Sequence, residues 1–174
     1  MKNSENIKDL IEQAKKLRER EEFEKALEIL EKINKENPDC QEIKESLVEA
    51  LFFYGGYLND FFVLKYEKAK EIFERIITLE PDNYRAHYNL GIAYFNLEDI
   101  NNAKNSYERA LKIKPDYKYC FYNLGLIYEE VEKLDKALEY YEKALEIDHN
   151  FVYALTARSQ VRQKLDDLKK KKIS

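Results

Sequence analysis

The sequence has 174 residues, of which 30 are Lys or Arg and 34 are Asp or Glu, so the formal net charge is −4. Gly occurs 4 times and Pro 3 times. Both counts fall well below the usual ~7% and ~5%, and sandwiches or barrels need frequent turns rich in these residues. Hydrophobic residues make up 44% of the chain, which argues against disorder. The composition therefore indicates an all-α fold, as a single domain or a short repeat array.

Several local features bear on the compartment and on the partners. The N-terminal residues lack the apolar core of a secretory signal, and the most apolar stretch, residues 50–64, is too short for a bilayer span of about 20 residues. Cys40 and Cys120 have no CxxC partner, so we interpret both as reduced structural thiols. The lysine run at 169–172 is typical of a solvated chain end. We expect a cytoplasmic protein that contacts neither a membrane nor nucleic acid, because its net charge gives no general attraction to phosphate backbones.

A small residue followed four positions later by a large one recurs along the chain. The pairs are Ala26 and Leu30, Ala69 and Phe73, Ala103 and Tyr107, and Ala137 and Tyr141. The last two steps are 34 residues each, and the first step is 43 residues. The prolines repeat these intervals, since Pro38 and Pro81 are 43 residues apart and Pro81 and Pro115 are 34 apart. Two residue series therefore indicate a repeat of 34 residues with a single insertion of 9 residues.

Around these positions the sequence resembles the tetratricopeptide repeat (TPR) family, whose unit reads W-x2-L-G-x2-Y, then A-x3-F, then P. The third repeat has His87, Leu90, Gly91 and Tyr94 at the first set of positions, and the fourth has Phe121, Leu124, Gly125 and Tyr128. The match is partial in the first repeat, with Gln13 and Ala14 at the Leu-Gly pair, and in the second, with Leu47 and Val48.

The resemblance implies an all-α fold, an α-solenoid of antiparallel helix pairs with about four TPR units and a C-terminal capping helix. We place the repeats at residues 7–40, 41–83, 84–117 and 118–151, and the capping helix with its basic tail at 152–174. The capping helix has an apolar stripe and is otherwise polar, as a soluble array end requires. The stripe contains Phe151, Ala154, Leu155, Val161, Leu165 and Leu168.

In this family the first helix of each repeat lines a concave groove that binds peptides, and the register selects the residues that face it. These are Glu42, Glu45, Ser46, Glu49, Phe52 and Phe53 in the second repeat, Arg85, Tyr88, Asn89, Ile92, Phe95 and Asn96 in the third, and Tyr119, Tyr122, Asn123, Leu126, Glu129 and Glu130 in the fourth. So many aromatic side chains on a solvent-facing surface indicate a partner surface. The alternative is that Tyr88, Phe95 and Tyr122 fill the spaces between adjacent first helices.

Asn89 and Asn123 stand at equivalent positions one repeat apart. The resemblance implies that such asparagines hold the main chain of an extended peptide, because a carboxamide both donates and accepts hydrogen bonds. The alternative is that each side chain bonds only within its own repeat.

The charge of the expected groove points to the chemistry of its ligand. Acidic groove positions are Glu42, Glu45, Glu49, Glu129 and Glu130. Together with the aromatic residues they favour a ligand with apolar anchors flanked by Lys or Arg. Chaperone-binding members of the family hold an acidic C-terminus with a clamp of two lysines, an arginine and two asparagines. This sequence does not match that clamp, so we expect no strong binding of an acidic chaperone tail.

The insertion falls within residues 55–65, between the two helices of the second repeat. We expect Gly55 and Gly56 to end the first helix early, and Asn59 or Asp60 to cap a second helix lengthened to begin near Phe61. The apolar side chains of this segment are Tyr57, Leu58, Phe61, Phe62 and Leu64. Either Tyr57 and Leu58 fold back over the others, or the segment forms a contact with a partner or a second copy.

Catalysis has little support in the sequence. The histidines, His87 and His149, form no metal-binding spacing, and no phosphate-binding glycine loop is present. We predict a non-enzymatic protein–protein interaction scaffold that needs no cofactor or metal and binds a peptide or partner segment in the groove. The alternative is a structural assembly unit, such as a homodimer, that self-associates through residues 55–65 or through the array ends.

Overall fold

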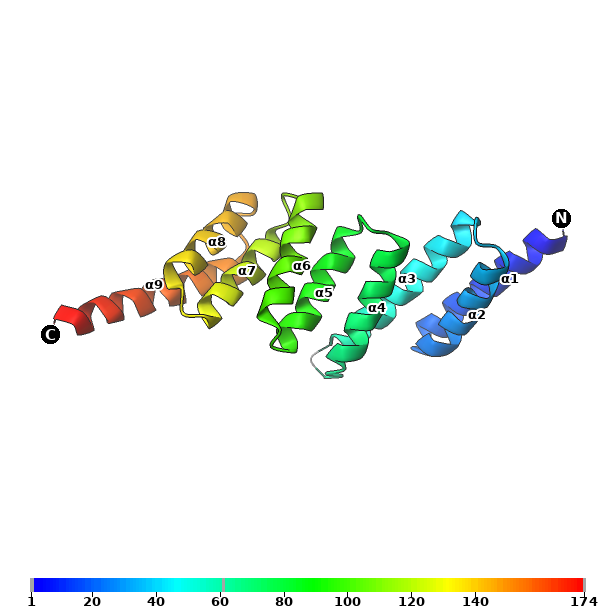
Figure 1. The fold of residues 1–174 in the computed structure, drawn as a ribbon, viewed down its shortest axis with the longest axis horizontal. Coiled ribbons are helices and arrows are strands. Elements are labelled where there is room, and N and C mark those ends of the chain that lie inside the picture. The colour runs from blue at the N-terminus through cyan, green and yellow to red at the C-terminus, as the bar shows by residue number, and fades with distance from the viewer. Residues whose placement is uncertain (1, 61, 174) are drawn as a thin grey trace. The chain divides into compact units, whose positions relative to one another are not determined.

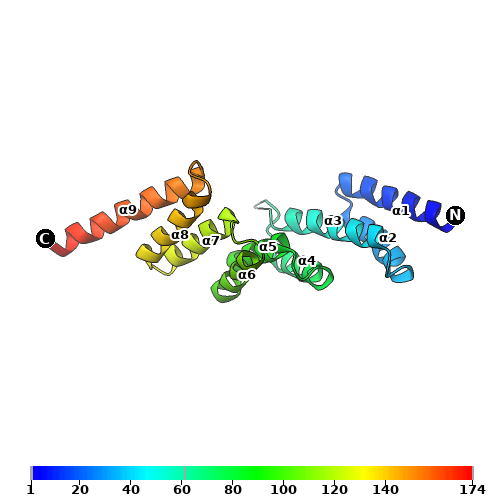
Figure 2. The ribbon, with the colours of Figure 1, turned by 90° about the horizontal axis from the view of Figure 1, so that it is seen from above.

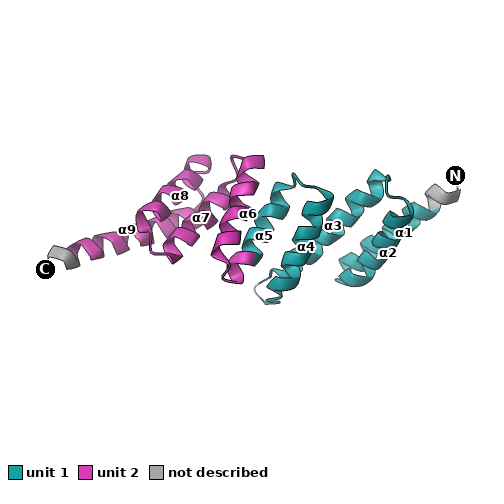
Figure 3. Ribbon diagram, viewed as in Figure 1, with its two compact units in different colours: residues 1–93 teal, residues 94–174 magenta. Residues whose placement is uncertain are grey.

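A computed structural model describes residues 2–60 and 62–173, and these residues form nine α-helices and no strand. The all-α prediction is therefore confirmed. The chain divides into two compact units, unit 1 (residues 1–93) and unit 2 (residues 94–174), which are coloured separately in Figure 3. No helix within the described ranges is both long and apolar enough to cross a lipid bilayer.

Unit 1 is built from consecutive helices that lie side by side (Figure 1). They are α1 (Lys2–Glu19), α2 (Phe23–Glu36), α3 (Gln41–Leu58), α4 (Tyr66–Leu79) and the first part of α5 (Tyr84–Asn96). Unit 2 follows the same plan. It contains the end of α5, α6 (Ile100–Ile113), α7 (Lys118–Glu130), α8 (Leu134–Ile147) and α9 (Val152–Ile173). In unit 2, α7 packs on α8 and α8 packs on α9, whose later turns extend past α8 in both views (Figures 1 and 2).

The repeated small-and-large pairs form the centres of these helix packings. Ala69, Ala103 and Ala137 are completely buried, and the large partner four residues on is buried with each of them. These partners are Phe73, Tyr107 and Tyr141. Residues four apart lie on one face of a helix, so a small residue beside a large ring lets the neighbouring helix approach closely. The period read from the sequence is thus the period of the core.

The turns within the helix pairs use left-handed backbone conformations without glycine. Glu21, Leu64, Glu98 and Glu132 have φ values of 61°, 54°, 60° and 55°. Each stands in the turn that joins one helix to the next. Non-glycine residues are uncommon in this region of backbone space. The scarcity of glycine therefore does not mean a scarcity of turns.

The expected form of the insertion is wrong. α3 continues through Gly55 and Gly56 to Leu58, while α4 begins at Tyr66 and has 14 residues, the same as α6 and α8. α3 has 18 residues where α7 has 13. The insertion therefore lengthens the first helix of the pair and the loop 59–65, and leaves the second helix unchanged.

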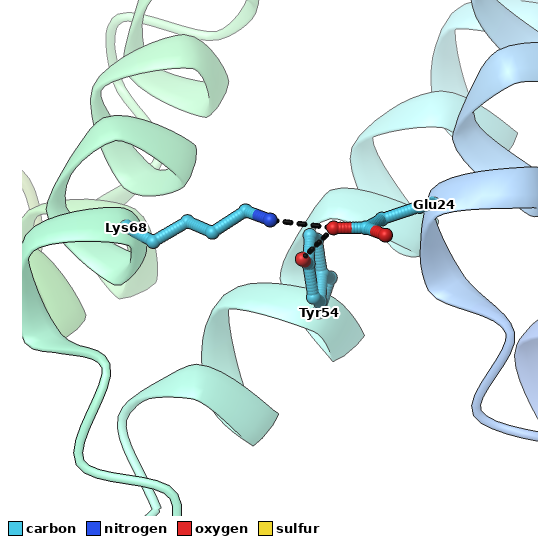
Figure 4. Close-up of polar contacts among 3 residues, drawn as sticks. All are labelled: Glu24, Tyr54 and Lys68. Atoms are coloured by element: carbon cyan, nitrogen blue, oxygen red, sulfur yellow. Dashed lines mark hydrogen bonds and ion pairs between the residues drawn. The ribbon is translucent and has the colours of Figure 1, made fainter.

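Three helices of unit 1 are joined by one polar contact (Figure 4). Oε1 of Glu24 on α2 accepts a hydrogen bond of 2.8 Å from the Tyr54 hydroxyl on α3 and lies 2.5 Å from Nζ of Lys68 on α4. These donors hold the pKa of Glu24 below its usual value, with the hydrogen bond from Lys68 as the largest cause. The contact links α2, α3 and α4, and the two charged side chains in it are exposed.

Candidate functional site: a pocket in each unit

Unit 2 contains an open pocket of about 1050 Å³ formed largely by α7 and α9. Its lining consists of Phe95, Tyr122, Leu126, Glu129, Glu130, Glu132 and Leu134, together with Val152, Tyr153, Thr156, Ala157, Gln160, Lys164, Asp167 and Leu168 from α9. We call this cavity the unit 2 pocket. It brings together five residues that the sequence places in the groove: Phe95, Tyr122, Leu126, Glu129 and Glu130.

Aromatic rings meet at one end of the unit 2 pocket. The ring centroid of Tyr122 lies 5.8 Å from that of Tyr141, 5.6 Å from that of Phe151 and 6.0 Å from that of Tyr153. Burial raises the pKa of Tyr122, with smaller contributions from Tyr153 and Glu129, so its hydroxyl stays protonated at neutral pH. Tyr153 and Val152 remain 66% and 67% exposed. The first turn of α9 thus presents a large apolar surface beside the cavity.

Glu129 is the most constrained carboxylate of this pocket. The hydroxyl of Tyr141, a residue that is completely buried, donates a hydrogen bond of 3.0 Å to Glu129 Oε2. The Lys164 ammonium of α9 forms an ion pair with Glu129 Oε1. The Glu129 side chain is 20% exposed, and that of Lys164 is 55% exposed. A carboxylate is therefore held in a defined position, with a cation beside it.

The sequence did not indicate that α9 lines a pocket. Ala154 and Val161 are buried against the preceding helices, as expected for the apolar stripe of this helix, and Ala157, which the sequence analysis does not place on the stripe, is buried as well. Leu168, also placed on that stripe, is 48% exposed and lines the unit 2 pocket instead. Tyr153, Thr156, Gln160 and Lys164 form a neighbouring stripe, and their spacing of three or four residues could have identified it.

Unit 1 contains a second open pocket, of about 650 Å³, which we call the unit 1 pocket. Its lining consists of Glu45, Val48, Glu49, Phe52, Phe53, Gly56, Tyr57, Glu80, Asn83 and Arg85. Two arginines cover its aromatic rings: Arg85 lies 5.2 Å above the ring of Phe52, and Arg18 lies 4.5 Å above that of Phe53. Arg18 also forms an ion pair of 2.9 Å with Glu49. Five expected groove residues therefore lie around one cavity: Glu45, Glu49, Phe52, Phe53 and Arg85.

Family models match residues in both units. A family model described as tetratricopeptide repeat matches residues 84–117 and 119–151, and a second model with the same description matches residues 65–83. The chain belongs to the TPR family. MamA has a similar structure, with a TM-score of 0.70 and 26% sequence identity, and the match covers 88% of this chain and 84% of MamA.

Two further TPR structures similar to this chain contain peptides. The first TPR of Spaghetti (RPAP3), bound to the HSP90 peptide SRMEEVD, is 24% identical with a TM-score of 0.62, and the match covers 68% of this chain and 93% of that one. The second TPR domain of human RPAP3, in complex with the HSP70 peptide SGPTIEEVD, is 22% identical with a TM-score of 0.61, over 68% and 98% of the two chains.

Eight of the groove residues expected in this TPR protein line neither pocket. They are Glu42, Ser46, Tyr88, Asn89 and Ile92 in unit 1, and Asn96, Tyr119 and Asn123 in unit 2. The Asn89 amide donates a hydrogen bond of 2.8 Å to the Arg85 carbonyl, within its own helix. Its backbone carbonyl accepts a hydrogen bond of 3.1 Å from the Asn59 amide. Tyr119 instead packs against Phe151, with ring centroids 5.3 Å apart.

The residues of the predicted oligomer contact differ in exposure and in packing. Leu58 is 1% exposed and belongs to the core, and Tyr57 packs on Phe23 with ring centroids 5.2 Å apart. Phe62 and Leu64 are 90% and 56% exposed. Phe61, a further member of the predicted contact, lies outside the described residues. Neither Tyr57 nor Leu58 therefore covers Phe62, so the alternative in which they fold back over the segment does not hold for Phe62.

His87 and the two cysteines are of types that can serve in catalysis, but their surroundings are typical of structural residues. Nε2 of His87 lies 2.9 Å from the Pro81 carbonyl, to which the ring N–H donates. Cys120 is completely buried, and burial raises the pKa of its thiol to about 12, so it remains protonated and unreactive. Cys40 is a half-buried free thiol. Within residues 2–60 and 62–173, no three His, Cys, Asp or Glu side chains cluster as a metal site would require.

Proposed function

We propose that this TPR protein is a non-enzymatic interaction scaffold that binds a peptide or a segment of a partner protein in its unit 2 pocket, with the unit 1 pocket as a second contact. The observation that carries the proposal is the exposed apolar surface of Val152 and Tyr153 beside a cavity of about 1050 Å³. Exposed apolar groups gathered at a concave site and rimmed by polar groups are typical of a binding site.

The charges of the pocket favour a basic ligand over an acidic one. The unit 2 pocket is lined by the carboxylates of Glu129, Glu130, Glu132 and Asp167 and by the ammonium of Lys164 alone. Two similar TPR structures hold chaperone peptides that end in EEVD. Such peptides would place carboxylates beside carboxylates, and like charges in contact oppose binding. We therefore propose a ligand with apolar anchors flanked by Lys or Arg, and no strong binding of an acidic chaperone tail.

Peptide selection tests the location of the site. Random dodecapeptides displayed on phage are selected on the immobilised chain, and the affinities of the enriched peptides are measured for the wild type and for a Val152→Ser/Tyr153→Ser variant. Both side chains are about two-thirds exposed (67% and 66%), so this variant keeps the fold. We expect its affinity to fall about tenfold or more, because the apolar anchor is lost.

The matched control is Ile147→Ser, which removes an apolar side chain of unit 2 that is 40% exposed and lines neither pocket. We expect this variant to bind the peptides as the wild type does. If Val152→Ser/Tyr153→Ser has no effect on any enriched peptide, or if no peptide is enriched, the unit 2 pocket is not the binding site.

A second candidate function is self-association through the loop 59–65. It is supported by the exposure of Phe62 and Leu64, and Asp60 Oδ1 accepts a 2.9 Å hydrogen bond from the Phe62 backbone N–H. The test is the molar mass by light scattering over a range of concentrations. A dimer that dissociates in a Phe62→Ser/Leu64→Ser variant would support self-association, and a wild-type monomer at every concentration would exclude it.

A further inference from the structure

We infer that Glu129 selects a Lys or Arg side chain of the bound segment, and that Lys164 is an internal competitor for the same carboxylate. The inference rests on the proposed function of the unit 2 pocket and specifies its ligand. It assigns different roles to the two partners of one ion pair. Glu129 is a specificity residue, and Lys164 sets the affinity by competing with the ligand.

A buried tyrosine holds the Glu129 carboxylate in position. Tyr141, which donates a hydrogen bond to Glu129 Oε2, is completely buried, and its ring packs against Gly125 on α7. The Glu129 side chain is only 20% exposed. A carboxylate that is partly removed from water interacts more strongly with a cation than one on an open surface. Because the Glu129 carboxylate is already oriented, it loses little conformational entropy when a ligand cation binds.

Lys164 is the movable partner. Its side chain is 55% exposed and reaches Glu129 from α9 through four flexible methylene groups. Exposed ion pairs of lysine contribute little free energy, because holding the side chain in one rotamer costs entropy. The Tyr141 hydroxyl can remain on Oε2 while the ammonium on Oε1 is exchanged. A ligand ammonium or guanidinium can therefore replace Lys164 without disturbing the buried contact.

The surroundings of Glu129 favour such an exchange. Glu130 and Glu132 are exposed and line the same pocket, so their negative charges also attract a cation. Asp167, the remaining carboxylate, accepts a 3.1 Å hydrogen bond from the Gln163 amide. Leu126 and Tyr153 also line this cavity. The ligand that matches this arrangement carries one Lys or Arg next to an apolar side chain.

The test uses dodecapeptides selected on the wild-type chain that lose affinity with Val152→Ser/Tyr153→Ser. Each is measured, with its basic residue intact or replaced by norleucine, against the wild type, Glu129→Gln and Lys164→Met. Gln can still accept the Tyr141 hydrogen bond, and Met retains much of the lysine stem. We expect the norleucine replacement to lower the affinity for the wild type about tenfold and to leave the affinity for Glu129→Gln almost unchanged. We expect Lys164→Met to bind the basic peptide about threefold to tenfold more tightly.

The matched control is Arg162→Met, which breaks the 2.7 Å ion pair between Arg162 of α9 and Glu142 of α8 outside the pocket. It should leave affinity unchanged. The inference is overturned if pocket-dependent peptides carry no Lys or Arg, if norleucine costs the same on Glu129→Gln as on the wild type, or if Lys164→Met behaves as Arg162→Met does. These results would leave peptide binding in the pocket intact. An absence of pocket-dependent peptides would instead reject the proposed function, and this inference with it.

Discussion

Gly55 in unit 1 and Gly125 in unit 2 both face an aromatic ring of the following helix, but at different distances from the start of their own helix. A Cβ atom on Gly55 would lie 2.7 Å from Cζ of Phe73, and one on Gly125 would lie 2.4 Å from Cε1 of Tyr141. Gly125 comes seven residues after the start of α7, whereas Gly55 comes fourteen residues after the start of α3. The seven additional residues correspond to about two helical turns.

Two whole turns preserve the helix face, and this explains how the insertion is tolerated. The sequence motif places Val48 where the other repeats have glycine, but the close approach to α4 occurs at Gly55, roughly 10 Å further along α3. Val48 is 7% exposed and lines the unit 1 pocket with Phe52. The additional turns of α3 thus supply part of that pocket. The contact between helices, and not the local motif, identifies the equivalent residues.

The largest expected effect is that of Gly125→Ala. The new methyl group would meet the ring of Tyr141, which is completely buried and held by its hydrogen bond to Glu129, so neither side can yield. We expect a loss of about 2 kcal/mol in the free energy of unfolding, as for other overpacked cores. Chemical denaturation followed by circular dichroism measures it. A variant as stable as the wild type would show that the helices of unit 2 can separate locally.

Gly55→Ala should have a smaller effect, because the atoms that its new methyl group would meet can move more easily. The nearest atoms are the far end of the Phe73 ring and, at 3.1 Å, a methyl group of Ile72. We expect a loss of about 1 kcal/mol, smaller than for Gly125→Ala because a ring tip can shift. The internal control is Gly56→Ala, since no atom lies within 4 Å of its new methyl group. That variant should gain about 0.5–1 kcal/mol from helix propensity. Equal effects at Gly55 and Gly56 would contradict the assignment of Gly55 as the close-approach residue.

The core could be predicted from the sequence because its signal is local and repeated. Ala103 and Tyr107 lie four residues apart on one helix, so their spacing alone places them on a buried face, and both are buried. The path of α3 could not be predicted in this way. Gly55 and Gly56 disfavour a helix interior, yet the packing of Gly55 against Phe73 continues the helix. Tertiary contact here outweighs local propensity.

Only part of the candidate site could be predicted from the sequence. Tyr122 and Leu126 follow from the register of the TPR motif, because their positions relative to Leu124 and Gly125 fix the face on which they lie. The wall supplied by α9 has no motif. Lys164 and Glu129 are 35 residues apart, and nothing local indicates that they form a pair. Contacts between helices depend on the packing, which the motif describes only within a repeat.

A smaller change in stability is expected at the turn residues with left-handed backbone conformation, which can be compared in the same two repeats. Leu64 has φ 54° in the turn before α4, and Glu132 has φ 55° in the turn before α8. Replacing either by glycine removes the clash of Cβ with the backbone but increases the entropy of the unfolded chain. We expect Leu64→Gly and Glu132→Gly each to gain about 0.5 kcal/mol in unfolding free energy. A loss for either variant would mean that its side chain contributes more than its backbone strain costs. Thermal and denaturant unfolding measure both.

The smallest expected effect concerns acid stability. Asp148 lies 2.5 Å from Nζ of Lys118 in unit 2, and the hydrogen bond from Lys118 is the main cause that lowers the pKa of Asp148. In unit 1, Lys68 is the main cause that lowers the pKa of Glu24. A carboxylate whose pKa is lower in the folded state stabilises the protein above its unfolded pKa, about 4, and this stabilisation is lost as the pH falls through the folded pKa.

Melting temperatures at low salt, compared between about pH 6 and pH 3, should therefore fall less in Lys118→Met and Lys68→Met than in the wild type. The Lys118 and Asp148 side chains are 25% and 34% exposed, whereas those of Lys68 and Glu24 are 45% and 72% exposed. Water and salt screen the second pair more strongly, so Lys118→Met should reduce the acid sensitivity more than Lys68→Met. The opposite order would mean that the three-helix contact around Tyr54 stabilises its charges more than exposure alone predicts.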